Sequence, residues 1–202
     1  MPIEAYIGKS LNNPVTNPQL SQADLEAKWD APQKMRNKAV GAALSDGTNL
    51  VHTYLMYVPG LVTYCTIGPL PVWTGDMTGC FLFRFRMNGK LCAAHVGTDS
   101  TDEDKNRHAK ATWLALMNNP EVSDVWGCDP GKDIPTTTLQ RVMAARRPSN
   151  ITGWWETNGA MRIVTLLGAH GNWRTKEIFS VDLAPLRPWS VLANDRKFRV
   201  TP

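Results

Sequence analysis

The clearest alternation of hydrophobic and polar positions lies in residues 80–97, where two apolar-rich segments flank the dipeptide Asn88-Gly89. Asn-Gly between two such segments is the strongest short-range signal for a β-hairpin. A two-residue loop also fixes the register of the two strands. The expected cross-strand pairs are Met87 with Lys90, Phe85 with Cys92, Leu82 with His95, and Cys80 with Gly97.

Successive side chains of a strand point to opposite faces, which sorts the hairpin residues into two sets. The set expected to face a core is Phe81, Phe83, Phe85, Cys92, Ala94 and Val96, and the other is Cys80, Leu82, Arg84, Arg86, Leu91, Ala93 and His95. Cys80 and His95 thereby become diagonal neighbours, with Cα atoms roughly 7–8 Å apart. An imidazole and a thiol can bridge that gap.

The remaining pattern predicts a mixture of helices and strands. Helices are expected over residues 22–30, 33–44, 102–117 and 137–146, and strands over 51–58 and 61–67 as a pair, over 178–183, and in a second hairpin around Asn158-Gly159. Residues 68–79 and 121–135 are expected to be irregular. Because no regular βαβ rhythm appears, the predicted class is α+β, with a mixed, mostly antiparallel sheet flanked by helices and a sandwich-like arrangement as one option.

Length and composition predict a single domain over residues 1–202, with residues 1–19 as a loop or flexible arm. The chain is 43% hydrophobic, which is ample for a core. No apolar segment approaches the roughly 18–20 residues that a bilayer span needs, and no signal-peptide pattern opens the chain. We therefore expect a soluble protein made in the cytoplasm, with secretion or delivery into a target cell left open. The net charge of +4 gives no argument for nucleic acid as a partner.

The four cysteines, Cys65, Cys80, Cys92 and Cys128, include no CxxC pair, and no HExxH motif occurs. No metal or cofactor is therefore expected. Cys80 differs from the other three because a histidine is expected beside it. A neighbouring imidazolium stabilises a thiolate, and the same histidine can then protonate a leaving amine. Gly79 leaves space for a substrate carbonyl, and backbone N–H groups at this point could hold an oxyanion.

The elements Thr78-Gly79-Cys80 and His95-Val96-Gly97-Thr98 resemble the catalytic domain of the cytotoxic necrotizing factors. Those bacterial toxins carry Ser-Gly-Cys and His-x-Gly-Thr elements at this spacing and deamidate a glutamine of host Rho GTPases. A bacterial lethal factor that deamidates a translation-initiation helicase, and the chemotaxis receptor deamidases, share the cysteine–histidine arrangement. In these last two groups a threonine lies six residues before the cysteine, where this chain has Thr74.

The resemblance, which covers residues 74–98, implies that Cys80 is the nucleophile, His95 the base and Thr74 the residue that orients it. It implies a protein-glutamine deamidase of the bacterial toxin or effector type. Its partner would be a protein substrate, such as a host GTPase, a translation factor or another glutamine-bearing protein. Thr78 stands where the relatives usually have serine.

Two other interpretations remain open at this point. A papain-like peptidase or a transglutaminase would use the same two residues for acyl transfer. Alternatively, the eight tryptophans would serve a non-enzymatic interaction module in which Cys80 is structural. Cys65, Cys92 and Cys128 are expected to be core residues. Of the neighbours Trp154 and Trp155, one is expected in the core and one at the surface.

Overall fold

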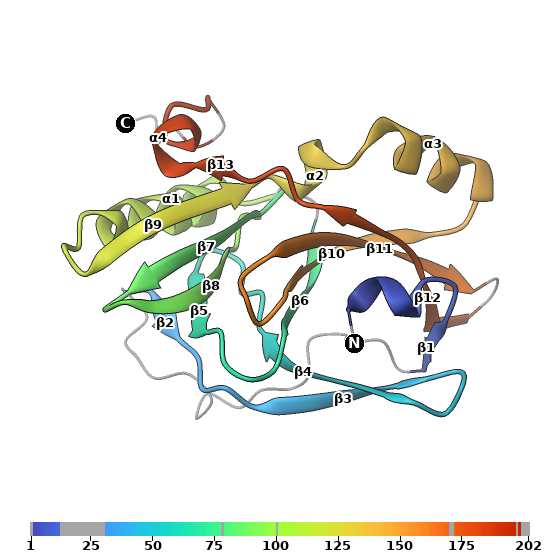
Figure 1. Ribbon diagram of the computed structural model, residues 1–202. Helices are drawn as coiled ribbons and strands as arrows, with labels where there is room; N and C mark the ends of the chain where they lie inside the picture. The colour runs from blue at the N-terminus through green and yellow to red at the C-terminus, as the bar shows by residue number, and fades with distance from the viewer. Residues whose placement is uncertain are drawn as a thin grey trace.

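The computed structural model describes residues 2–12, 31–77, 79–99, 101–169, 172–196 and 198. These residues form an α+β fold, as predicted, in which each of the described strands belongs either to a closed barrel or to a separate six-stranded sheet (Figure 1). The sandwich-like arrangement stays a prediction. No helix in the described ranges combines the length and the apolar character required to cross a bilayer.

Seven strands close the barrel in the order β1-β12-β11-β10-β6-β4-β3. Their bounds are β1 (Ser10–Asn12), β3 (Ala39–Leu44), β4 (Asn49–Leu55), β6 (Val72–Met77), β10 (Ser149–Trp155), β11 (Met161–Ala169) and β12 (Asn172–Leu183). Strand β1 pairs with both β12 and β3, which closes the ring. All pairs are antiparallel except β4 with β6.

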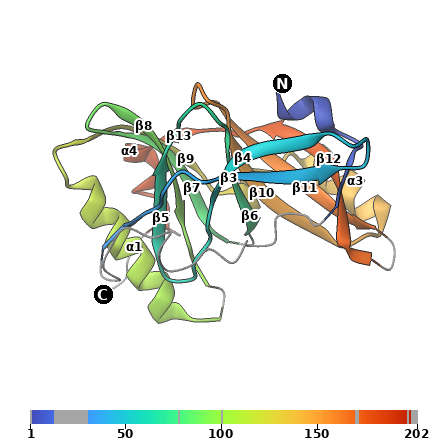
Figure 2. The same ribbon diagram turned by 90° about the horizontal axis from the view of Figure 1, so that it is seen from below.

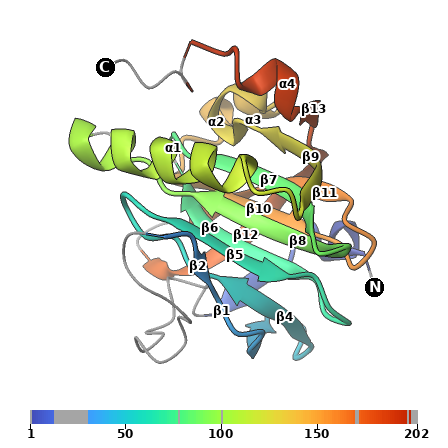
Figure 3. The ribbon, with the colours of Figure 1, turned by 90° about the vertical axis from the view of Figure 1, so that its left-hand side faces the viewer.

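The second sheet has the order β13-β9-β7-β8-β5-β2. Its strands are β2 (Gln33–Lys34), β5 (Val62–Thr66), β7 (Phe81–Met87), β8 (Lys90–Val96), β9 (Val122–Cys128) and β13 (Arg187–Pro188). Helix α1 (Glu103–Met117) covers one face of this sheet (Figure 3), on the side of the molecule away from β11 and β12 (Figure 2). The shorter helices are η1 (Ile3–Tyr6), α2 (Pro130–Asp133), α3 (Thr136–Ala145) and α4 (Trp189–Leu192).

Apolar side chains form three clusters that together explain the layers. The first fills the space between α1 and the sheet, where Phe83 stacks on Trp113 with ring centroids 4.1 Å apart. The second lies on the other face of the same sheet and includes Leu82, Ala93, Trp155 and residues of the barrel wall. The third fills the barrel. Because both faces of the six-stranded sheet are covered, most residues of its central strands β7 and β8 are buried.

The predicted hairpin is confirmed, including its register. Met87 pairs with Lys90, Phe85 with Cys92 and Leu82 with His95. Asn88 and Gly89 have φ of 50° and 73°, the positive values that a tight hairpin turn requires. The helices expected over 102–117 and 137–146 are observed as α1 and α3, and the second hairpin is observed as β10 and β11.

Several local predictions are wrong because long-range pairing overrides local propensity. Residues 33–44 form β2 and β3 rather than a helix, since β3 pairs with β4 and β1 to close the barrel. Strands are present in 51–58 and 61–67, but β4 joins the barrel and β5 the other sheet, so they do not pair with each other. The segments expected to be irregular contain β6 and β9. The helix expected over 22–30 lies outside the described residues.

Two further expectations need correction. Within the segment expected to be a loop or arm, residues 2–12 form η1 and β1, and the side chains of Ile3 and Leu11 are fully buried in the barrel. Trp154 and Trp155 are both buried, rather than one in the core and one at the surface. Their strand β10 lies between the barrel interior, which takes Trp154, and the layer against the six-stranded sheet, which takes Trp155.

Candidate functional site

His95 and Thr74 meet where the six-stranded sheet packs against the barrel. His95 is on β8 and Thr74 is on the barrel strand β6. Thr74 Oγ1 lies 2.7 Å from His95 Nδ1, within hydrogen-bonding distance, and neither side chain is more than 1% exposed. The two residues are 21 positions apart in the sequence. The tertiary structure thus brings together the two residues that the resemblance assigns as base and orienting group.

Gly153 makes this close approach of the two layers sterically possible. It pairs with Thr74 across β10 and β6. A Cβ atom at position 153 would lie 2.2 Å from a Leu82 methyl carbon and 3.2 Å from Thr74 Cγ2. Because Leu82 is the cross-strand partner of His95, a side chain at position 153 would displace the Leu82 methyl group that lies beside the strand carrying the imidazole.

Cys80 lies directly before β7 and is 3% exposed. Its Sγ is 3.8 Å from the backbone carbonyl oxygen of Thr98 and 3.8 Å from Thr98 Oγ1. The Thr98 hydroxyl donates to the carbonyl oxygen of Gly79 at 2.8 Å. Thr98, which belongs to the His-x-Gly-Thr element, therefore ties the end of β8 to the Gly79-Cys80 segment. Thr98 stands in the His-x-Gly-Thr motif, but the sequence alone did not predict a role for it.

Tyr57 covers this region from the loop between β4 and β5. Its ring centroid lies 5.1 Å from that of His95, with 31° between the ring planes. Its hydroxyl donates to the same Thr98 carbonyl oxygen, at 2.8 Å. Sequence reasoning missed Tyr57, because nothing local distinguishes it from the other apolar-rich residues of its segment.

Burial sets the protonation states of this site. It lowers the pKa of His95 to about 3, so the imidazole is neutral at physiological pH. Burial also raises the pKa of the Cys80 thiol, an effect that the contacts with Thr98 oppose. The pKa of Tyr57 rises to about 12 through burial and the nearby Cys80 and Asp99. The closed site thus holds a neutral imidazole and a protonated thiol rather than the thiolate–imidazolium pair expected from the sequence.

The reactive atoms of His95 and Cys80 are not hydrogen-bonded to each other. Among the described residues, His95 Nε2 has no hydrogen-bond partner at all. When Nδ1 carries the proton and donates it to Thr74 Oγ1, Nε2 keeps a lone pair that can accept a proton. A basic nitrogen without a hydrogen-bond partner, in the same buried region as a thiol, is suited to general base catalysis.

The other sequence candidates do not join this site. Cys65, Cys92 and Cys128 are free and buried, as expected of core residues. Within the described part of the chain, no three His, Cys, Asp or Glu side chains are grouped so that they could hold a metal ion. The candidate site therefore consists of Thr74, Cys80 and His95, with Tyr57 and Thr98 around them.

Comparison of the chain with protein-family models, with curated proteins and with solved structures gave no match.

Proposed function

We propose that the protein is a protein-glutamine deamidase in which Cys80 is the nucleophile and His95 the general base and acid. The observation that carries the proposal is the buried contact between Thr74 Oγ1 and His95 Nδ1, 2.7 Å long. This contact fixes the imidazole through Nδ1 and leaves Nε2 free. Thr74 is also the residue that the motif resemblance implies as the one orienting His95. A catalytic imidazole is typically oriented in this way by a hydrogen bond to its second nitrogen.

The reaction begins when His95 Nε2 accepts the thiol proton of Cys80 and the thiolate attacks the side-chain amide carbon of a glutamine. Backbone N–H groups at Gly79 and Cys80 stabilise the oxyanion of the tetrahedral intermediate. The imidazolium then protonates the amide nitrogen, ammonia leaves, and a thioester to Cys80 remains. His95 next accepts a proton from water, whose oxygen attacks the thioester carbon. Collapse of this intermediate returns the thiol and leaves glutamate.

Because Cys80 is buried, a neighbouring group has to move before a substrate enters, and we propose that this group is Tyr57. The Thr98 carbonyl oxygen, to which Tyr57 now donates, lies within 3.8 Å of Cys80 Sγ. A glutamine carboxamide carries two N–H donors beside the carbon that the sulfur attacks. One of these N–H groups can replace the Tyr57 hydroxyl on this acceptor, and a glutamate carboxylate cannot. Exchange of the two donors would open the site and select for the amide.

The biological setting follows from the resemblance alone. We propose a bacterial toxin or delivered effector whose substrate is a protein of the target cell, such as a GTPase or a translation factor. Neither catalysis nor binding in this scheme calls on a cofactor.

The decisive experiment is mass spectrometry of host-cell proteins incubated with the purified protein, which should reveal a glutamine converted to glutamate with a mass gain of about one dalton. Cys80→Ser should abolish the conversion, because a serine hydroxyl ionises too weakly to replace a thiolate. Cys92→Ser, which changes a buried thiol outside the site, should retain it. A Cys80→Ser protein that still deamidates its target would overturn the proposal. Cross-linked or cleaved products in place of glutamate would indicate a transglutaminase or a peptidase.

Replacement of Thr74 by valine should lower turnover roughly tenfold, less than a change to Cys80 or His95, because it removes one orienting hydrogen bond and no reacting atom. The imidazole ¹⁵N chemical shifts should change as well, since the proton on Nδ1 loses its acceptor. Thr165→Val is the matched control, because the Thr165 hydroxyl is buried and, among the described residues, has no hydrogen-bond partner. Unchanged kinetics and unchanged ¹⁵N shifts in Thr74→Val would show that another group orients His95.

Replacement of Tyr57 by phenylalanine should speed alkylation of Cys80 by iodoacetamide about fivefold, the equivalent of one hydrogen bond of about 1 kcal/mol. Tyr57→Ala should speed it further, because the ring against His95 is lost as well. The alkylation of Cys92 in the same sample serves as the internal reference, and Tyr64→Phe is the control variant. If Cys80 reacts equally fast in all these proteins, Tyr57 does not restrict access to the thiol.

A further inference from the structure

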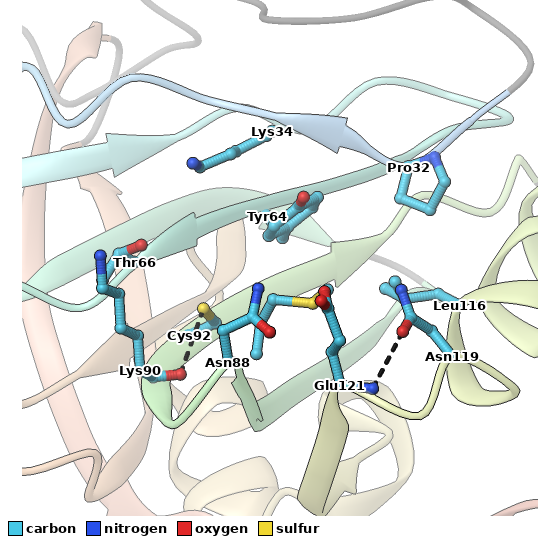
Figure 4. A pocket seen from close by; sticks show the side chains of 11 residues that line it. Pro32, Lys34, Tyr64, Thr66, Asn88, Lys90, Cys92, Leu116, Asn119 and Glu121 are labelled. Atoms are coloured by element: carbon cyan, nitrogen blue, oxygen red, sulfur yellow. Dashed lines mark hydrogen bonds between the residues drawn. The ribbon is translucent and has the colours of Figure 1, made fainter.

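A polar pocket lies at the far end of the hairpin from Cys80, on the face of the sheet that α1 covers. Its volume is about 340 Å³. Figure 4 shows the side chains that line it. Helix α1 ends at Met117. The part of the sheet face that holds Tyr64, Thr66 and Cys92 therefore has no helix above it and lines the pocket. The pocket therefore results from the length of α1, and it shares no residue with the candidate catalytic site.

One end of the pocket is basic. Lys34 comes from β2 and Lys90 from the hairpin turn, and Figure 4 shows both ammonium groups at the end of the pocket where Thr66 lies. Strand pairing brings them there, because Lys34 is paired with Tyr64 and Thr66 with Cys92. Burial raises the pKa of the Cys92 thiol, and the charges of Lys34 and Lys90 oppose this rise, which is consistent with two ammonium groups near the pocket floor.

The opposite end of the pocket favours a cation. Glu121 and Asn119 line it, directly after the C-terminal end of α1. This helix has 15 residues and no basic residue in its last turn, so the partial negative charge of its C-terminus is not compensated from within the helix. The Glu121 segment is held in place, because its N–H donates to Asn119 Oδ1 and its carbonyl oxygen accepts from the Asn88 N–H.

Lys90 and Glu121, at the two ends of the pocket, do not pair with each other. Neither Lys90 nor Glu121 forms an ion pair with another described residue, although both line the same pocket. Apolar atoms of Leu116, Met87 and Pro32 also line it. The arrangement is complementary to a molecule with a negative group at one end, a positive group at the other and an aliphatic part between them.

We propose that this pocket binds a small zwitterion of the amino-carboxylate type, with its carboxylate at Lys34, Lys90 and Thr66 and its ammonium group at Glu121 and the end of α1. This site is independent of the proposed deamidase activity. Its ligand makes no covalent bond, and selectivity comes from the simultaneous presence of both charges.

The test compares three probes: 6-aminohexanoate, which carries both charges, hexanoate, which carries only the negative charge, and hexylammonium, which carries only the positive charge. Binding is followed by NMR titration of the Lys90 and Glu121 backbone amides in the full chain. The zwitterion should bind at least tenfold more tightly than either single-charge probe. Lys90→Met should weaken zwitterion binding about fivefold, the equivalent of one partly exposed ion pair, while leaving hexylammonium binding unchanged. Glu121→Gln should weaken it similarly while leaving hexanoate binding unchanged.

Lys110→Met, which removes a lysine of α1 outside the pocket, is the control and should bind all three probes as the wild type does. Equal binding of hexanoate and 6-aminohexanoate would overturn the proposal in favour of a simple anion site. Binding that neither Lys90→Met nor Glu121→Gln alters, or no response of these amides to the zwitterion, would overturn it as well.

Discussion

A protein with His95→Ala is expected to release ammonia from its glutamine substrate roughly 10²–10⁴-fold more slowly than the wild type, the usual contribution of a general acid–base group. Both half-reactions should slow, because the same imidazole takes the thiol proton, protonates the amide nitrogen that leaves as ammonia, and later activates water. Single-turnover measurement of ammonia release, together with intact-mass detection of an acyl-enzyme on Cys80, separates the two steps.

Controls must distinguish lost chemistry from a damaged fold, because the His95 side chain is 1% exposed and alanine leaves a cavity. His95→Gln is the second variant, since its amide can still hydrogen-bond Thr74 but cannot accept a proton near neutral pH. His108→Ala removes an exposed histidine and should react at the wild-type rate. A folded His95→Gln protein that deamidates as fast as the wild type would exclude His95 from the mechanism.

Acidification from pH 7 to pH 5 is expected to lower the free energy of unfolding by about 4 kcal/mol, about 2 from each of two buried histidines. Burial lowers the pKa of His95 to about 3 and that of His52 to about 4. His52 lies inside the barrel, where its Nδ1 is 3.0 Å from the Leu50 carbonyl oxygen and its ring centroid 5.2 Å from that of Trp73. Both rings stay neutral in the folded protein at pH 5, whereas the unfolded chain binds a proton on each.

The lowered pKa values of the two histidines mean that acidification lowers the free energy of unfolding. A histidine with a lowered pKa contributes its full stability above about pH 6.5, the value in the unfolded chain, and loses it as the pH falls towards the folded value. Several carboxyl groups, including that of Asp46, have their pKa lowered by hydrogen bonds, so their contribution is lost only at pH values below about 4. The window from pH 7 to pH 5 therefore isolates the histidines.

Urea unfolding at several pH values in this window provides the measurement. His52→Phe should roughly halve the loss, because an apolar ring replaces the titrating one among the barrel aromatics. His108→Gln, at an exposed position, should leave the pH dependence unchanged. Equal unfolding free energies of the wild type at pH 5 and pH 7 would mean that neither buried histidine stays neutral in the folded protein.

Burial of His95 underlies both its proposed role as a base and the loss of stability in acid. The same burial that keeps the imidazole neutral makes the folded protein less stable when the unfolded chain binds a proton at this histidine. A neutral imidazole is the form that can accept the Cys80 proton, so the low pKa keeps the base ready over a wide pH range. The same burial disfavours the thiolate and the imidazolium that form when the proton moves from Cys80 to His95. Substrate dipoles and backbone N–H groups at Gly79 and Cys80 would have to stabilise the thiolate once Tyr57 moves aside.

The sequence by itself determined the hairpin, its register and the placement of Cys80 and His95 on one face. It could do so because a two-residue turn links the strands through local geometry, and because Asn88 and Gly89 accept the positive φ values that the turn needs. The helix α1 was equally predictable, since acidic residues occupy its first turn, although only the structure shows that Asp102 caps it by accepting a hydrogen bond from the Lys105 N–H.

Only the tertiary structure decided which barrel strand lies against the hairpin. The contact between Thr74 and His95 joins strands of two different sheets, and Gly153 permits it by leaving space for Leu82. Motif resemblance named Thr74, but no local pattern could place it, nor could any pattern place Tyr57 over the imidazole. Turns and helix caps depend on neighbours in sequence, whereas the closure of the barrel and the burial of this site depend on pairing between strands far apart in the chain.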